Sequence, residues 1–242
     1  MKICVAQTRP IKGDIQSNID NHKKLIDLAV TRGADTIIFP ELSITGYEPE
    51  LAKDLATTPD DRRFDDFQMM AGARQITIGI GVPIKNERGI CISMLIFQPG
   101  RARQTYSKKY LHADEEDFFV SGQNVSVTIS NTTKIAPAIC YELSVPEHAA
   151  NAFKNGAEVY LASVAKSAEG VDKAVASLSG IARKYAVPVL MSNCIGPSSG
   201  FESAGRSAIW NNHGILLGQL NGASEGILML DTETQEIIAK TI

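Results

Sequence analysis

The order of strand and helix patterns along the chain constrains its fold most strongly. Near the start, Lys2 to Gln7 and Thr36 to Phe39 have the apolar character of buried strands, and apolar residues at helical spacing predict an amphipathic helix from Asp14 to Arg32 between them. A strand–helix–strand unit of this kind favours parallel pairing of its two strands, because the helix carries the chain back along the sheet.

The middle of the chain has a different pattern. Ile76 to Ile84, Ile90 to Phe97 and Arg101 to Ser107 are consecutive predicted strands with short connections, which indicates antiparallel hairpins. Strand–helix alternation returns after Cys140, and hairpin-like strands follow from Ser207 to Asp231. This combination indicates an α/β protein with mixed sheets. We therefore predict a four-layer α-β-β-α sandwich with two mixed β-sheets, formed by residues 1–242 as a single domain.

Charge and hydropathy narrow the class of partner. The formal net charge is -3 without a basic block, which argues against nucleic acid or an anionic membrane as a partner. No apolar run is long enough to span a bilayer, and the first residues lack the apolar core of a signal peptide. We therefore expect a cytoplasmic protein that acts on a small molecule. Two glycosylation sequons, at residues 124–126 and 131–133, have meaning only in a secreted protein.

The cysteines are widely spaced. Cys4, Cys91 and Cys194 lie in strand-like segments, and Cys140 ends one. In a reducing compartment all four are expected to be free thiols. They form no Cys-x-x-Cys pair, so the sequence predicts no metal site.

Cys140 occupies the position of a covalent nucleophile. It ends the apolar run that begins at Lys134, and the chain then turns directly into a predicted helix. Ser144 and Glu147 have the spacing of a capping box that would begin this helix, so backbone N–H groups near Tyr141 could face a developing oxyanion. The competing interpretation is a small apolar core residue.

Two further fragments carry groups that would activate a thiol. Glu41 lies between apolar runs, so burial would raise its pKa toward the range useful for a general base. Lys108 and Lys109 both follow the end of a strand, and either could supply a cation. Glu115 could hold that ammonium, although an acidic run such as residues 114–117 is by itself typical of a solvated loop.

These fragments together resemble the nitrilase (carbon–nitrogen hydrolase) superfamily, which uses a Glu-Lys-Cys triad on an α-β-β-α sandwich. The matching segments occur in the family's order over almost the whole chain: Phe39-Pro40-Glu41 with Gly46-Tyr47, Lys108 with Leu111, and Ile139-Cys140-Tyr141-Glu142 with Pro146-Glu147. The position of Leu111 selects Lys108 over Lys109, and Gly122 points to Glu115 as the supporting glutamate, with Glu116 close by.

The resemblance implies a mechanism without metal or organic cofactor. Glu41 would act as base, Cys140 as nucleophile, and Lys108 with the Tyr141 backbone N–H would stabilise the oxyanion. Nitrile-hydrolysing members carry tryptophan after the nucleophile, so Tyr141 favours a small amide or carbamoyl substrate. The resemblance also implies a homo-oligomer, expected to be a dimer.

Several alternatives remain open at this stage. Glu142 is expected to be structural or to face a substrate amine, and Lys166 to bind a substrate carboxylate or to lie on the surface. An acyltransferase would share the same acyl-enzyme, and a non-catalytic binding relative would share the fold. A Cys-His pair using His112 or His148 lacks an evident third partner.

Overall fold

The computed structural model describes residues 1–123, 129 and 133–242, and the asparagines of both sequons lie outside them. Within this part of the chain, two large sheets and one small hairpin are formed. The first sheet has the order β14 (Ile237–Thr241), β13 (Gly226–Asp231), β1 (Lys2–Gln7), β2 (Thr36–Ile38), β3 (Thr77–Asn86), β4 (Gly89–Phe97) and β5 (Gln104–Ser107). The second has the order β12 (Leu216–Gln219), β11 (Ala208–Trp210), β8 (Val189–Asn193), β7 (Val159–Val164) and β6 (Ile135–Ile139).

Both sheets are mixed, as the sequence predicts. The strand–helix units give the parallel pairs β1–β2, β2–β3, β6–β7 and β7–β8. The meander gives the antiparallel pairs β3–β4 and β4–β5. β9 (Ile195–Ser198) and β10 (Phe201–Ala204) form the separate hairpin, which the sequence analysis did not identify.

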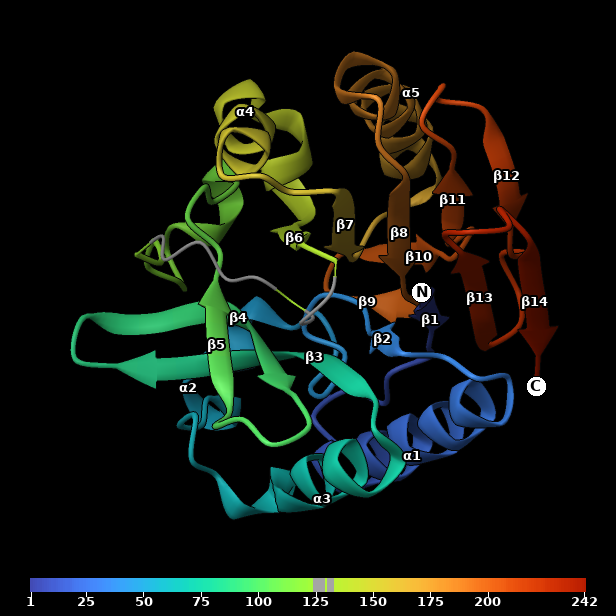
Figure 1. The fold of residues 1–242 in the computed structure, drawn as a ribbon. Coiled ribbons are helices and arrows are strands. Elements are labelled where there is room, and N and C mark those ends of the chain that lie inside the picture. The colour runs from blue at the N-terminus through green and yellow to red at the C-terminus, as the bar shows by residue number, and fades with distance from the viewer. Residues whose placement is uncertain (124–128, 130–132) are drawn as a thin grey trace.

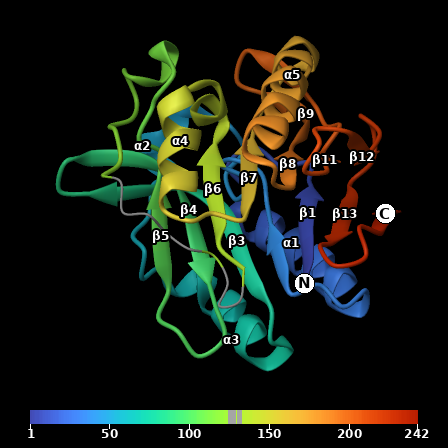
Figure 2. The ribbon, with the colours of Figure 1, turned by 45° about the horizontal axis from the view of Figure 1, so that its top comes forward.

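Helices cover the outer face of each sheet, so the protein has four layers (Figure 1). α1 (Ile15–Thr31) and α3 (Asp65–Arg74) lie outside the first sheet, and α4 (Pro146–Lys154) and α5 (Ala168–Tyr185) lie outside the second. Figure 2 shows α4 and α5 side by side over β6, β7 and β8. The predicted α-β-β-α sandwich is therefore confirmed. No helix in the described ranges is long and apolar enough to cross a membrane.

The buried apolar residues separate into three clusters that match the spaces between the four layers. One lies between the first sheet and its helices and includes Leu25 and Phe67. A second lies between the two sheets and includes Val5 and Leu161, and a third lies under α4 and α5 and includes Trp210. Burial of both faces explains why the central strands have continuous apolar sequences.

His22 links α1 to the segment that carries Glu41 through hydrogen bonds. Its ring is 1% exposed, and its Nδ1 and Nε2 lie 2.7 Å from the Asn18 carbonyl oxygen and 2.9 Å from Ser43 Oγ. The ring also stacks on Phe39, with 4.0 Å between ring centroids. Burial lowers the pKa of His22 to about 3, so the ring is neutral at pH 7. It is a hydrogen-bonded core histidine.

The capping box predicted for the start of α4 is wrong. The helix begins at Pro146 with Val145 as its N-cap, and the cap has no side-chain hydrogen bond. Ser144 instead ends a short 3₁₀ turn, η4 (Cys140–Ser144), in which the Glu142 carboxylate accepts a hydrogen bond from the Ile139 N–H at 2.8 Å. Glu142 therefore caps η4, the turn before α4, and α4 itself has no side-chain cap.

Candidate active site

Three strands of two sheets end at the candidate site. Glu41 follows β2, Lys108 follows β5, and Cys140 follows β6. Glu41 and Lys108 are buried, with exposed fractions of 1% and 0%. Lys108 Nζ donates hydrogen bonds to Glu41 Oε1 at 2.8 Å and to Glu115 Oε1 at 2.6 Å. The structure thus places one ammonium between two buried carboxylates.

Glu115, and not Glu116, lies against Lys108. Its Oε1 also accepts a hydrogen bond from Tyr47 Oη at 3.1 Å, and its Oε2 accepts one from the His112 N–H at 2.8 Å. Glu116 is exposed. Because both oxygens of Glu115 are bonded, this carboxylate is fixed as a support for the ammonium.

The turn that carries Glu41 is tightly packed. Leu42 has φ +50°, an uncommon conformation for a residue with a side chain. Gly81 of β3 lies directly beneath this turn, and a Cβ there would clash with the backbone of Pro40 and Leu42. Glu41 Oε1 is bonded to Lys108, but Oε2 is buried and has no hydrogen-bond partner in the described part of the chain. Glu41 therefore keeps one oxygen free to accept a proton.

The backbone of Lys108 is held on both sides. Its N–H donates to the Ile92 carbonyl at 2.8 Å, and its carbonyl accepts from the Gly122 N–H at 2.7 Å. A Cβ on Gly122 would clash with the Ser107 carbonyl, so this close approach requires glycine. The sheet and the segment at Gly122 thus fix the position from which the Lys108 side chain enters the site.

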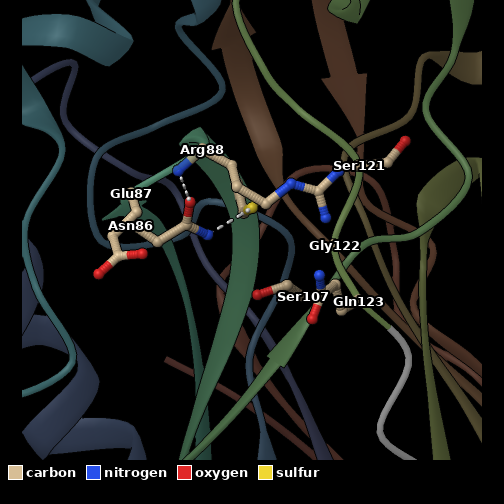
Figure 3. A pocket seen from close by; sticks show the side chains of 8 residues that line it. Asn86, Glu87, Arg88, Ser107, Ser121, Gly122 and Gln123 are labelled. Carbon is tan, nitrogen blue, oxygen red and sulfur yellow. Dashed lines mark hydrogen bonds between the residues drawn. The ribbon is translucent and has the colours of Figure 1, made fainter.

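The segment at Gly122 also forms part of the wall of a cavity of about 380 Å³. Figure 3 shows the Arg88 side chain extending toward Ser121 and Gly122, and Asn86 Nδ2 donating to the sulfur of Cys91 at 3.3 Å. Neither Glu41, Lys108 nor Cys140 lines this cavity. It is therefore separate from the candidate site, although its wall includes Ser107, the neighbour of Lys108.

Cys140 sits on a strained turn between β6 and η4. Its φ is +42°, and the residue is part-buried while Cys4, Cys91 and Cys194 are buried. The sulfur lies 3.9 Å from the Ala165 carbonyl oxygen at the end of β7. Burial, with a smaller contribution from the Glu41 carboxylate, raises the pKa of the Cys140 thiol, and Lys166 and Lys108 oppose this, so that the net pKa is about 11. The thiol is therefore protonated at pH 7 and needs a base.

The charges of the site act on one another. Burial raises the pKa of the Glu41 carboxyl; Lys108 opposes this effect and the Glu115 carboxylate adds to it. For Lys108, burial disfavours the ammonium, but Glu41, Cys140 and Glu115 together raise its pKa. Lys108 is therefore charged at pH 7, and Glu41 is a stronger base than a solvated carboxylate.

Glu142 is fully buried and bonds to none of Glu41, Lys108 and Cys140. Its Oε1 accepts from the Lys109 N–H at 2.8 Å, and its Oε2 accepts from Ile139 N–H at 2.8 Å and Tyr106 Oη at 2.6 Å. It thereby links the segment that follows Lys108 to the segment that precedes Cys140. The structure supports a structural role for Glu142, one of the two roles left open by the sequence.

Hydrogen bonding behind Glu142 fixes the tautomer of His148. Tyr106 donates its proton to the carboxylate, so the His148 Nε2, 2.8 Å away, must donate to Tyr106 Oη. Nδ1 is then an acceptor and receives the proton of Tyr160 Oη at 2.8 Å. All four side chains of this network (Glu142, Tyr106, His148 and Tyr160) are buried.

The remaining candidate residues lie around Cys140. Tyr141 is 38% exposed, and its ring contacts that of His112 at 5.3 Å between centroids. His112 pairs with Asp114 and His148 with tyrosines, so neither imidazole bonds to Cys140. Lys166 follows Ala165 and is part-buried. The structure thus brings Lys166 close to Cys140 and gives the Cys-His alternative no geometric support.

Sequence reasoning missed several residues that build the site. The Tyr106–His148–Tyr160 chain joins distant positions that share no motif, and no local signal identifies it. The Ala165 carbonyl contacts Cys140 through backbone alone. Within the described residues, no cluster of His, Cys, Asp and Glu side chains has the arrangement of a metal site.

The fold places the protein in a known structural class. A solved structure of a cysteine-to-serine mutant of the Nesterenkonia AN1 amidase, from the nitrilase superfamily, has a TM-score of 0.87 and 22% sequence identity, and the match covers 97% of this chain and 92% of that chain. Another structure of that amidase, in complex with butyramide, has the same TM-score and identity. At this identity the likeness shows the fold.

The family follows from the sequence comparison. The carbon-nitrogen hydrolase family profile matches residues 2–240, so the chain belongs to that family, as the motifs predict. The glutamine-dependent NAD(+) synthetase of Thermotoga maritima is 24% identical over 98% of this chain, but this chain spans only 42% of that protein. The "hydrolase in agr operon" of Staphylococcus aureus is 23% identical over 98% of this chain and 93% of its own length.

Proposed function

We propose that the protein is a thiol-dependent hydrolase that cleaves the non-peptide C–N bond of a small amide through a thioester on Cys140. The observation that carries this proposal is the state of Glu41. It is 1% exposed, bonded to Lys108 through one oxygen and unpartnered within the described residues at the other. A buried carboxylate with a free oxygen next to a protonated thiol is suited to proton transfer.

The reaction begins when Glu41 takes the thiol proton and the sulfur of Cys140 bonds to the amide carbon. The carbonyl oxygen gains negative charge, which the Lys108 ammonium and the Tyr141 backbone N–H stabilise. This N–H lies in the first turn of η4, where backbone donors lack intrahelical acceptors. Glu41 then gives its proton to the leaving nitrogen as the C–N bond breaks.

The second half of the reaction regenerates the enzyme. Water attacks the thioester carbon while Glu41 takes its proton. The carbon–sulfur bond breaks, the carboxylic acid leaves, and the proton returns to the sulfur of Cys140. Throughout, Glu115 keeps the Lys108 ammonium in place through the 2.6 Å hydrogen bond.

The substrate class is proposed from the residue after the nucleophile and from related proteins. Tyr141 favours amides or carbamoyl compounds over nitriles. The amidase with a similar fold binds butyramide, and relatives of this chain are glutamine-dependent. Butyramide and glutamine therefore belong in the first substrate panel. An acyltransferase remains the second candidate, because an amine could replace water at the thioester.

The test measures ammonia release from small amides by the wild-type protein and by the Cys140→Ala variant. We expect release that the substitution abolishes, by roughly 10³-fold or more, without a change in the thermal midpoint of unfolding. Mass spectrometry after rapid acid quenching should detect the acyl group on the peptide containing Cys140.

Three results would contradict the proposal. Equal ammonia release by Cys140→Ala would exclude this residue as the nucleophile. Absence of release from every amide, together with amide binding, would favour a non-catalytic relative. If product forms only when an amine acceptor is added, the protein is an acyltransferase.

A further inference from the structure

The backbone of Lys166 is held rigidly beside the nucleophile. Its N–H donates to Asn193 Oδ1 at 2.9 Å, and its carbonyl accepts from Asn193 Nδ2 at 3.2 Å and from the Ala204 N–H at 2.9 Å. The preceding residue, Ala165, places its carbonyl oxygen 3.9 Å from Cys140 Sγ. The root of the Lys166 side chain is therefore fixed at the site and not on a free loop.

The ammonium of Lys166 is uncommitted. It forms no hydrogen bond or ion pair with any of the residues that the structure describes, whereas Lys12, Lys108 and Lys173 pair with carboxylates. Gly170 of α5 leaves room beside it, since a Cβ there would approach Lys166 Cβ to 3.3 Å. The side chain is part-buried, so it can reach a bound molecule without being sealed in the core.

The charge of Lys166 acts electrostatically on Cys140 and Glu41. Its charge lowers the pKa of the Cys140 thiol more than the charge of Lys108 does, and it also lowers the pKa of Glu41. Lys108 already bridges two carboxylates, which leaves the buried Glu41–Lys108–Glu115 group with one negative charge in excess. An anionic substrate would be repelled by this excess, and the charge of Lys166 offsets it.

We propose that Lys166 is a specificity-determining residue that binds the carboxylate of an amide substrate while Cys140 attacks the amide carbon of the same molecule. The substrate class is then the monoamides of dicarboxylic acids and amino acids with a side-chain amide. This inference rests on the proposed amidase function. A fixed backbone with an unpaired ammonium is the arrangement expected of a preorganised anion contact.

The test compares amides of equal length that differ in one charge. Succinamate is paired with butyramide, and glutaramate with pentanamide. The variants are Lys166→Met, which removes the charge and retains the stem, and Lys166→Arg, which retains the charge. Lys173→Met is the matched control, because Lys173 is exposed on α5 and pairs with the exposed Glu169.

We expect Lys166→Met to lower kcat/KM for the anionic amides about 10- to 100-fold, mainly through a higher KM, because a hydrogen bond to a charged group is lost. The loss with the neutral amides should be several-fold smaller, because it reflects only the effect of the Lys166 charge on the thiol and on Glu41. Lys166→Arg should recover most of the anionic activity. Lys173→Met should behave as wild type with all four amides.

Distinct outcomes separate this inference from the proposed function. An equal loss with charged and neutral amides would overturn it, because Lys166 would then only tune the thiol. Thiol-dependent hydrolysis without a preference for anionic amides would also overturn it and leave the amidase function intact. If Cys140→Ala and wild type are equally inactive with all four amides, the proposed function fails and the inference fails with it.

Discussion

Two buried carboxylates, Glu41 and Glu142, bond to neighbouring residues, Lys108 and Lys109, but differ in how their oxygens are paired. Both are at most 1% exposed. Glu142 has both oxygens occupied by three uncharged donors from Tyr106, Lys109 and Ile139. Glu41 has one oxygen on an ammonium and one buried oxygen unpartnered within the described chain. Equal burial therefore produces a structural anchor in one case and a group suited to proton transfer in the other, depending on how many lone pairs are filled.

The largest effect should come from Glu41→Gln. The amide cannot take the thiol proton, so we expect kcat/KM to fall about 10³-fold. The free energy of unfolding should be unchanged or higher, because Lys108 and Glu115 are left as a neutral pair. Steady-state kinetics and urea denaturation measure the two quantities. Glu116→Gln, which alters an exposed neighbour, is the control. A marked loss of stability in Glu41→Gln would show that both carboxylates are anchors.

Glu142→Gln should lower the stability of the protein more than its activity. The new amide must direct a donor at the Lys109 N–H or at the Ile139 N–H, which leaves buried donors unpaired. We expect the free energy of unfolding to fall by about 2 to 3 kcal/mol, as measured by urea denaturation. The loss of activity should be smaller than in Glu41→Gln. Glu147→Gln, on the exposed side of α4, should leave stability unchanged. Wild-type stability in Glu142→Gln would remove the distinction between the two carboxylates.

The pH dependence of kcat/KM should follow the protonation state of Glu41. This residue acts as base only when deprotonated, and burial raises its pKa above the ordinary 4.5. Activity should therefore rise with pH through that raised pKa, and fall about tenfold per pH unit below it. Glu115→Gln removes a carboxylate that raises this pKa, so its acid limb should move to lower pH. An acid limb at or below 4.5 in the wild type would contradict the assignment.

The smallest effect should come from Tyr160→Phe, at the far end of the Glu142 network. The substitution removes the proton donated to His148 Nδ1 and leaves Tyr106 and Glu142 paired. We expect a loss of about 1 kcal/mol in the free energy of unfolding and kcat/KM within about threefold of wild type. A tenfold loss of activity would show that the network contributes to catalysis beyond anchoring.

Much of the fold could be predicted because its signals are local. The bounds of β1 match the predicted strand, and α1 differs by its two cap residues. β14 was missed because it is a part-exposed edge strand. The closing strands were expected to form hairpins, but β12 and β13 belong to different sheets. That division depends on which sheet offers a free edge, and no local pattern encodes it.

For the site, the sequence could identify candidate residues but not the hydrogen bonds and burial that connect them. Glu41, Lys108 and Cys140 each carry a motif, and the structure brings them into one region. The adjacent Glu115 and Glu116 could be distinguished only by burial. The role of Glu142 was uncertain because its partners Tyr106 and Lys109 lie in β5 and in the segment after it, far from Glu142 in the sequence. Such a network depends on packing that only the complete fold creates.

The pairing of β1 with β13 has a consequence for biosynthesis. Lys2 lies opposite Asp231 and Gln7 opposite Gly226, so β1 is synthesised long before the antiparallel strand that pairs with one of its edges. At about 5 to 20 residues per second, β1 waits on the order of 10 to 50 seconds with that edge bare. Nascent chains therefore expose a row of unpaired backbone groups during translation, and slowing synthesis before residue 226 should increase their need for a chaperone.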